Sequence, residues 1–160
     1  MSSIIYQIGD ATNPQCEGNK LILHCCNDIG AWGKGFVLSI SKRWSKPQKA
    51  YKQWYKGRFE DDSDFALGAV QFVQVEADMW VGNLVGQRGI ASKLSPFPVR
   101  YNAIEEGLTK VADFAITNHC SIHMPYIGCG LAGGSWKQVS SIIEKTLISN
   151  GLSVTVYALI

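Results

Sequence analysis

The chain has 160 residues, which fits one domain because two domains of half that length would each bury only a thin core. Its apolar fraction of 46% is typical of a globular protein and argues against a disordered chain. The net charge of +2 points to no class of partner, and no apolar run approaches the roughly 18 residues that cross a bilayer, so no membrane partner is expected. Residues 1–160 are therefore predicted to form a single domain.

The N-terminus and the cysteines indicate the compartment. Residues 1–10 contain neither a basic segment nor a long apolar segment, so they predict a strand and not a signal peptide. Five cysteines, an odd number, are typical of a reducing compartment, and we expect a cytoplasmic protein. His24 beside Cys25 and Cys26 raises a metal site as an alternative, but no second pair of ligands completes a set of four. Buried thiols are the better interpretation, and neither a metal nor a cofactor is predicted.

The first half of the chain predicts two strands, two helices and a pair of strands. Residues 4–8 and 21–26 are short apolar runs bounded by Gly, Asn and Asp, as strands are. The second run is apolar throughout, which is typical of a strand covered on both faces. A loop rich in glycine follows it at residues 30–35. The next elements are a short helix with Phe36, Val37 and Ile40 inward, a helix from Pro47 to about Lys56, and strands at residues 67–75 and 79–85.

Helices and strands alternate in the second half. The predicted elements are a helix with apolar residues at helical spacing over residues 101–115, a strand at 121–126, a second glycine-rich loop at 128–134, a helix from residue 136, and a strand at 153–159. Ser135 can cap the later helix, and Asn150 with Gly151 can end it. Alternation of this kind implies parallel strands with helices on both faces. The fold class predicted is α/β, a three-layer α/β/α sandwich around a mixed, mostly parallel sheet.

Both glycine-rich loops follow a buried strand and precede a helix. Ligands of open α/β sheets bind beyond the carboxyl ends of the strands. Glycine allows close approach of the backbone, and the N-terminus of the next helix offers free N–H groups to an anion. The two loops together therefore predict a clamp for a diphosphate. Neither loop has the spacing of a P-loop.

A basic segment lies between the first glycine-rich loop and the strand pair. Residues 29–59 contain eight Lys or Arg and no Asp or Glu, and an acidic cluster follows at residues 60–64. Such a run is commonly a solvated helix face. The functional alternative is a positive rim that attracts a ligand carrying phosphate.

Five segments of the sequence are distinctive: GDAT at residues 9–12, HCCN at residues 24–27, WGKG at residues 32–35, MPYIGCGL at residues 124–131, and VTVY at residues 154–157. Together they resemble segments of macro domains, which bind ADP-ribose. The HxxN and WGxG pattern is similar to the yeast-type ADP-ribose 1''-phosphate phosphatases. The PxIGCGL pattern is similar to the terminal ADP-ribose protein glycohydrolases. The resemblance implies a macro domain fold across the chain.

The resemblance also implies roles for individual residues. Asp10, with Ala11 beside it, would accept a hydrogen bond from the adenine amino group, although a turn residue bonding its own backbone is the alternative. Asn27 would hold a hydroxyl of the distal ribose, or serve only as a loop amide. Trp32 would cover that ribose or pack between loop and helix. The other ligand-binding residues implied are Gly33, Lys34, Gly35, Gln87, Gly128, Cys129, Gly130, Leu131 and Ala132.

His24 and Asn27 are the candidate catalytic residues. Histidine titrates near neutral pH, as a general acid or base should, although a histidine in an apolar run is also common in a protein core. The glycohydrolase branch has a catalytic Lys where this chain has Gln87, and an Asp where it has Ala132. Neither replacement forms a Schiff base or takes a proton, which argues against the glycohydrolase route.

Three functions follow, in order of preference. The first is binding of ADP-ribose with hydrolysis of ADP-ribose 1''-phosphate to ADP-ribose. The second is a non-catalytic ADP-ribose reader, or a hydrolase that acts on ADP-ribosylated protein. The third is a nucleic-acid-binding module using the basic, aromatic segment at residues 42–58, which is the least expected partner class.

Overall fold

The computed structural model describes residues 3–159, and its elements follow the predicted order of strands and helices. The strands and helices are β1 (Ile5–Ile8), β2 (Asn19–Asn27), α1 (Phe36–Arg43), α2 (Lys46–Lys56), β3 (Val70–Glu76), β4 (Met79–Gln87), α3 (Tyr101–Asn118), β5 (Cys120–Met124), α4 (Trp136–Thr146) and β6 (Val154–Ala158). Short 3₁₀ turns lie at Gly130–Ala132 and Ile148–Asn150. Within the described residues no helix is long and apolar enough to cross a membrane.

The six strands form one sheet in the order β1-β6-β5-β2-β4-β3. Every neighbouring pair is parallel except β3 and β4, which form an antiparallel hairpin. The mixed, mostly parallel sheet predicted from the alternation of elements is therefore confirmed. β2 lies between β5 and β4, so its apolar residues Leu21, Ile22 and Leu23 are completely buried.

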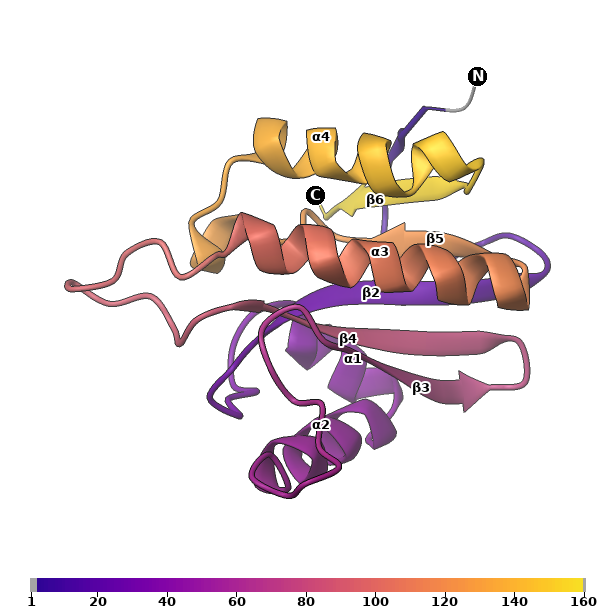
Figure 1. The fold of residues 1–160 in the computed structure, drawn as a ribbon. Helices are drawn as coiled ribbons and strands as arrows, with labels where there is room; N and C mark the ends of the chain where they lie inside the picture. The colour runs from indigo at the N-terminus through magenta and orange to yellow at the C-terminus, as the bar shows by residue number, and fades with distance from the viewer. Residues whose placement is uncertain (1–2, 160) are drawn as a thin grey trace.

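Helices cover both faces of the sheet (Figure 1). The long helix α3 and α4 lie on one face, where Ile104, Leu108 and Val111 pack against Leu84 and Ile122 of the sheet. Helices α1 and α2 lie on the other face, over β2, β4 and β3. Their apolar residues Ile40 and Tyr51 close a second core against Ile22 and Val81. The three-layer α/β/α sandwich predicted from the sequence is therefore confirmed.

Several element ends differ from the sequence prediction; β5, for example, ends at Met124 and not at residue 126. β3 begins at Val70 and not at residue 67, because Gly68 has φ +90° and interrupts the extended backbone. The α-helix α4 ends at Thr146, and a 3₁₀ turn continues it to Gly151, whose φ of 76° ends the helical segment. Ser135 takes the N-cap position of α4 but makes no capping bond with its side chain; its N–H donates to Tyr101 Oη at 2.9 Å.

Candidate ligand-binding cleft

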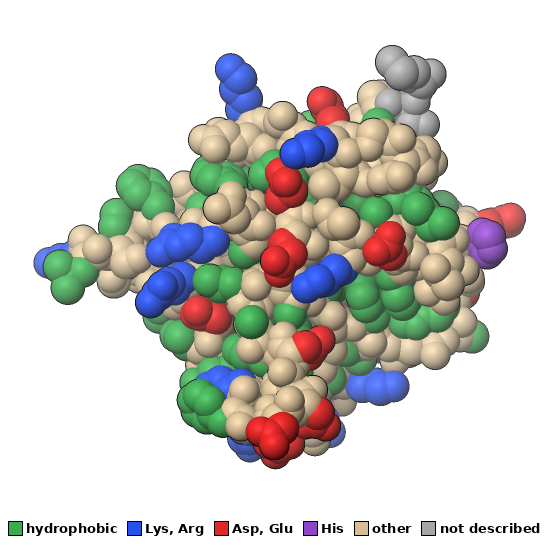
Figure 2. Space-filling model, viewed as in Figure 1, with side chains coloured by type: hydrophobic (Ala, Val, Ile, Leu, Met, Phe, Trp, Pro, Cys, Tyr) green, Lys and Arg blue, Asp and Glu red, His purple; other side chains and the backbone are tan. Residues whose placement is uncertain are grey.

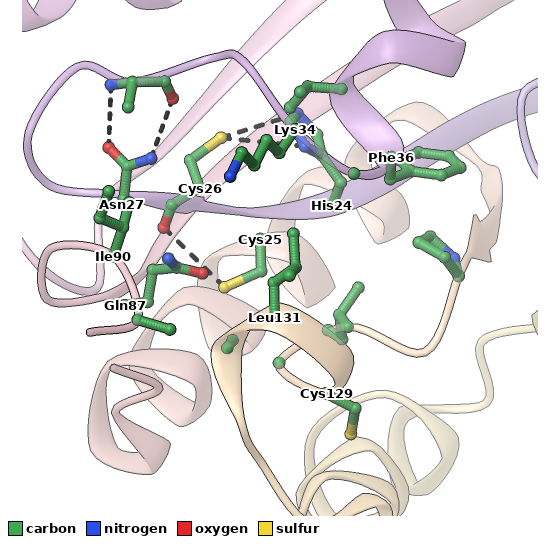
Figure 3. A pocket seen from close by; sticks show the side chains of 18 of the residues that line it. His24, Cys25, Cys26, Asn27, Lys34, Phe36, Gln87, Ile90, Cys129 and Leu131 are labelled. Carbon is green, nitrogen blue, oxygen red and sulfur yellow. Dashed lines mark hydrogen bonds between the residues drawn. The ribbon is translucent and has the colours of Figure 1, made fainter. Parts of the chain in front are cut away.

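A cleft opens at the carboxyl ends of β2, β4 and β5, where the two glycine-rich loops face each other (Figure 3). Its main cavity has a volume of about 430 Å³. A smaller hollow of about 230 Å³ lies beside it, against residues 9–11 and the end of β6. Phe36, Pro125 and Tyr126 line both the main cavity and the smaller hollow, so the two spaces form one elongated site. This is the position that the parallel strand order predicts for a ligand.

The amide of Asn27 organises the start of the first glycine-rich loop (Figure 3). Its Nδ2 donates to the carbonyl of Ala31 at 2.9 Å. Its Oδ1 accepts from the N–H groups of Ile29 and Ala31, both at 3.0 Å. The loop-amide alternative for Asn27 is therefore present in the structure. One hydrogen of Nδ2 has no protein acceptor in the described chain, so Asn27, which lines the cavity, also keeps a donor for a ligand.

The following residues of this loop keep their backbone donors free. Within residues 3–159, the N–H groups of residues 32–35 donate to no protein group. Gly33, Lys34 and Gly35 line the cavity, and Gly35 at the N-cap of α1 supplies no capping side chain. Because a backbone N–H needs an acceptor from protein, water or ligand, the donors of residues 33–35 are available to an anion in the cavity.

The second glycine-rich loop presents a matching row. Gly134 N–H donates to the carbonyl of Gly128 at 2.7 Å, which folds the loop back on itself. A Cβ on Gly134 would lie 2.1 Å from that same oxygen, so only glycine fits there. The N–H groups of Gly128, Gly130 and Leu131 find no acceptor in the described part of the protein. Gly128 and Leu131 line the cavity, so both loops offer free donors there.

The charge of the main cavity is positive. Lys34 is exposed and supplies the one Lys or Arg side chain among the described residues that line it, and no Asp or Glu lines it. The thiols there carry no charge, because burial raises the pKa of Cys25 to about 12 and also raises that of Cys129. Free N–H groups, one ammonium and no carboxylate favour an anionic ligand.

The smaller hollow contains the carboxylate of Asp10. Its Oδ1 accepts from the N–H of Thr12 at 2.9 Å and from the Thr12 hydroxyl at 2.7 Å, as the turn alternative predicts. Its Oδ2 lies 3.7 Å from Nη2 of Arg43. Burial raises the pKa of Asp10, but the bonds from Thr12 and the charge of Arg43 outweigh it and hold that pKa below its ordinary value. An ionised acceptor therefore stands beside Gly9 and Ala11 in this hollow.

Relatives identify the fold family of the chain. No protein-family model matches this sequence. A macrodomain protein from Streptomyces coelicolor of known structure is 49% identical, with a TM-score of 0.87 over 98% of this chain and 99% of that protein. The chain belongs to the macrodomain family. A protein of unknown function from Bacteroides thetaiotaomicron is 50% identical to this macrodomain, with a TM-score of 0.92 over 99% of this chain and 98% of the other.

More distant relatives carry functional names. The chromodomain-helicase-DNA-binding protein 1-like of Danio rerio is 31% identical over 98% of this chain, which spans only 16% of that longer protein. An ADP-ribose glycohydrolase from Bos taurus is 24% identical over 99% of this chain and 93% of its own length. An ADP-ribose 1''-phosphate phosphatase from Saccharomyces cerevisiae is 22% identical over 99% of this chain and 100% of its own length.

The predicted site residues of the macrodomain are distributed over the two spaces. Asp10 and Ala11 line the smaller hollow. Trp32 and Gly130 line neither space. The Trp32 ring is turned inward, where Nε1 donates to Ser41 Oγ at 2.8 Å, so the packing alternative describes its position. The main cavity is lined by the others: His24, Asn27, Gly33, Lys34, Gly35, Gln87, Gly128, Cys129, Leu131 and Ala132.

His24 reaches the main cavity from a buried position on β2. Its residue surface is only 1% exposed, and Nε2 lies 2.5 Å from Oδ1 of Asn83. Because that oxygen only accepts, Nε2 carries the hydrogen. Cys26 Sγ lies 3.7 Å from Nε2 and 3.9 Å from Nδ1. Burial lowers the pKa of His24 to about 4, so the ring is neutral at pH 7. The catalytic role of His24 stays a prediction, and these contacts favour a role in positioning.

Ten residues that line the main cavity were not among the predicted site residues: Cys25, Cys26, Ala31, Phe36, Val37, Ile90, Ala91, Pro125, Tyr126 and Ile127. Phe36 was expected inward, but it is half-buried and faces both spaces. Its position directly after the glycine-rich loop was an available signal. Ile90 and Ala91 belong to the loop after β4, which is held to β2 because Gly89 N–H donates to Asp28 Oδ1 at 2.7 Å. The sequence offered no sign of that contact.

Much of the basic segment is bound to the protein itself. Arg43 donates to Thr12 Oγ1, Lys46 to the carbonyl of Gln74, and Lys52 to the carbonyl of Gly30. Acidic side chains gather beside α2 at the bottom of the view in Figure 2, where Asp61 and Asp62 are exposed. These bonds hold the side chains in place, but Arg43 and Lys46 remain exposed and keep their charge at the surface.

Proposed function

We propose that this macrodomain, one domain over residues 1–160, binds ADP-ribose in the cleft and hydrolyses ADP-ribose 1''-phosphate to ADP-ribose. The observation that carries the proposal is the pair of facing rows of free N–H groups, next to a hollow that holds an ionised Asp10. A diphosphate between the loops would receive those donors. The adenine amino group would then reach Asp10.

The part of the cleft near Asn27 and Lys34, where the distal ribose would lie, suits the additional phosphate of ADP-ribose 1''-phosphate. Lys34 supplies positive charge there, and the remaining Nδ2 hydrogen of Asn27 can bind a ribose hydroxyl. In the hydrolysis, water attacks phosphorus, the bond from phosphorus to the ribose oxygen breaks, and that oxygen takes up a proton. Positioning accounts for most of the catalysis in this proposal. The names of the yeast phosphatase and the bovine glycohydrolase support a substrate of this class.

A non-catalytic reader of ADP-ribose is the second candidate. The observation that favours it is the burial of His24, whose surface is 1% exposed and whose Nε2 is bonded to Asn83. Hydrolysis of ADP-ribosylated protein is less supported, because Gln87 and Ala132 offer neither a nucleophile nor a base. A nucleic acid is the partner with least support, because exposed acidic side chains at residues 60–64 directly follow the basic segment.

Parallel assays decide between these functions. We expect phosphate release from ADP-ribose 1''-phosphate and little or no release of ADP-ribose from a glutamyl-ADP-ribosylated protein. Inactivity on both substrates, with ADP-ribose still bound, would establish the reader. Rapid release from the protein substrate alone would overturn the phosphatase assignment. We also propose a cytoplasmic location, supported by the five free cysteines.

A further inference from the structure

Tyr51 lies behind the first glycine-rich loop without touching the cavity. It is on α2, is completely buried, and packs its ring 5.5 Å from the ring of Trp32. Its aromatic body therefore belongs to the core between α2 and the sheet. Its hydroxyl, however, needs partners in that core, because an unpaired buried hydroxyl is destabilising.

Those partners are Asn27 at the end of β2 and Gly30 in the loop that follows it. Tyr51 Oη lies 2.7 Å from the carbonyl oxygen of Asn27 and 2.8 Å from Oδ1 of the same residue, and it shares its one hydrogen between them. It accepts from the N–H of Gly30 at 3.1 Å. Burial raises the pKa of Tyr51 well above its ordinary value, so the hydroxyl stays protonated and remains a donor.

These bonds divide the donors of the loop into two groups. The N–H groups of Ile29 and Ala31 go to Asn27 Oδ1, and that of Gly30 goes to Tyr51 Oη. The N–H groups of residues 32–35 come next and have no acceptor in the described chain. The three inward donors thus fix the backbone shortly before residues 33–35, which line the cavity.

Two further residues of α2, Lys52 and Tyr55, also restrict Gly30. A Cβ on Gly30 would lie 2.5 Å from the ring of Tyr55, and its φ is +76°. Lys52 Nζ donates to the Gly30 carbonyl at 2.5 Å. α2 therefore contacts both the N–H and the C=O of one loop residue, and Tyr51 makes the fully buried contact.

We propose that Tyr51 is a positioning residue of the ligand site, whose hydroxyl holds Asn27 and Gly30 so that the N–H groups of residues 33–35, which line the cavity, point to the ligand. The inference rests on the proposed binding of ADP-ribose for its effect on affinity. Its effect on the loop is independent of any ligand.

The first test uses the ligand-free protein. Tyr51→Phe removes one oxygen and keeps the ring in the core. We expect amide hydrogen exchange at Gly30 to become at least about tenfold faster, since its N–H loses its acceptor. Tyr55→Phe is the matched control on the same helix, because Tyr55 Oη makes no hydrogen bond in the described chain, and it should leave exchange at Gly30 unchanged. Unchanged exchange in Tyr51→Phe would overturn the proposal.

The second test compares two ligands by calorimetry. Tyr51→Phe should weaken ADP-ribose binding roughly threefold to thirtyfold and AMP binding by less than about twofold, because AMP lacks the part that reaches this loop. Equal weakening of both ligands would show a merely structural role and would contradict the proposal. If the wild-type protein binds no ADP-ribose, the proposed function fails. The exchange experiment still tests whether the Tyr51 hydroxyl fixes the loop backbone.

The wild-type protein gives a further check if Tyr51→Phe does not fold. The N–H of Gly30 should exchange slowly, and those of Gly33 and Lys34 should exchange fast. Equal exchange at the three positions would contradict the division of donors on which the proposal rests.

Discussion

His24 and Asn83 face each other across β2 and β4, with Nε2 of the histidine 2.5 Å from Oδ1 of the asparagine. Asn83 in turn donates to Gln71 Oε1 at 3.0 Å and to the carbonyl of Pro47 at the start of α2 at 3.3 Å. A neutral histidine therefore links the floor of the cleft to the helix that holds the first glycine-rich loop. Protonation of that ring would place a charge in the core.

We predict that acid destabilises the macrodomain between pH 6.5 and about pH 4. Burial lowers the pKa of both His24 and His123 to about 4, from an ordinary value of 6.5. In this window the unfolded chain binds protons that the native protein does not, so stability is complete above pH 6.5 and falls toward pH 4. The slope should reach about 1.4 kcal/mol per pH unit for each histidine.

Urea unfolding at pH 7, 6 and 5 measures this slope. His123→Asn should make the dependence shallower, even if it lowers stability at pH 7. His119→Asn is the control, because His119 is exposed after α3 and adopts φ 55°, which Asn tolerates. A free energy of unfolding that is constant from pH 7 to pH 5 would contradict the neutral, buried state of both rings.

Gly33→Ala should separate binding from folding. A Cβ at this position meets nothing within 4 Å, and the residue does not require a positive φ, so we expect no loss of stability. A ligand held by the neighbouring N–H groups would collide with the new methyl group. ADP-ribose affinity should fall at least about tenfold while the melting temperature is unchanged. Wild-type affinity in this variant would place the phosphates elsewhere.

Lys34→Gln tests the charge of the cavity. Lys34 is exposed and has no partner in the described chain, so its removal should leave stability unchanged. ADP-ribose affinity at low salt should fall roughly threefold to tenfold, and it should then depend less on salt. Lys49→Gln on the exposed face of α2 is the matched control and should bind as the wild type does. An equal loss in both variants would indicate general attraction and not a contact in the cleft.

Asp10→Asn should weaken the binding of AMP and of ADP-ribose by the same factor, about tenfold. Both ligands carry adenine, and the variant no longer offers its amino group a charged acceptor. The amide oxygen can still accept from Thr12, so the turn should persist. Calorimetry with the two nucleotides measures the factors. Unchanged binding of both would mean that adenine lies outside the smaller hollow.

The sequence predicted the layers of the fold and the place of the cleft, but not the contacts that shape it. The apolar run of β2 and the helical spacing of α3 depend on neighbours along the chain, and both were confirmed. The bond from Gly89 to Asp28, by contrast, joins segments far apart in sequence, as does that from Tyr51 to Asn27. Tyr51 was indistinguishable from a core aromatic, because its ring does pack in the core.

Titration of the wild-type protein with ADP-ribose in a calorimeter tests the central claim most directly. We predict one site per chain, tighter binding than AMP, and a melting temperature that rises with ligand concentration because the ligand binds only the native state. Absence of any binding heat at millimolar ADP-ribose, together with an unchanged melting temperature, would contradict the assignment of the cleft.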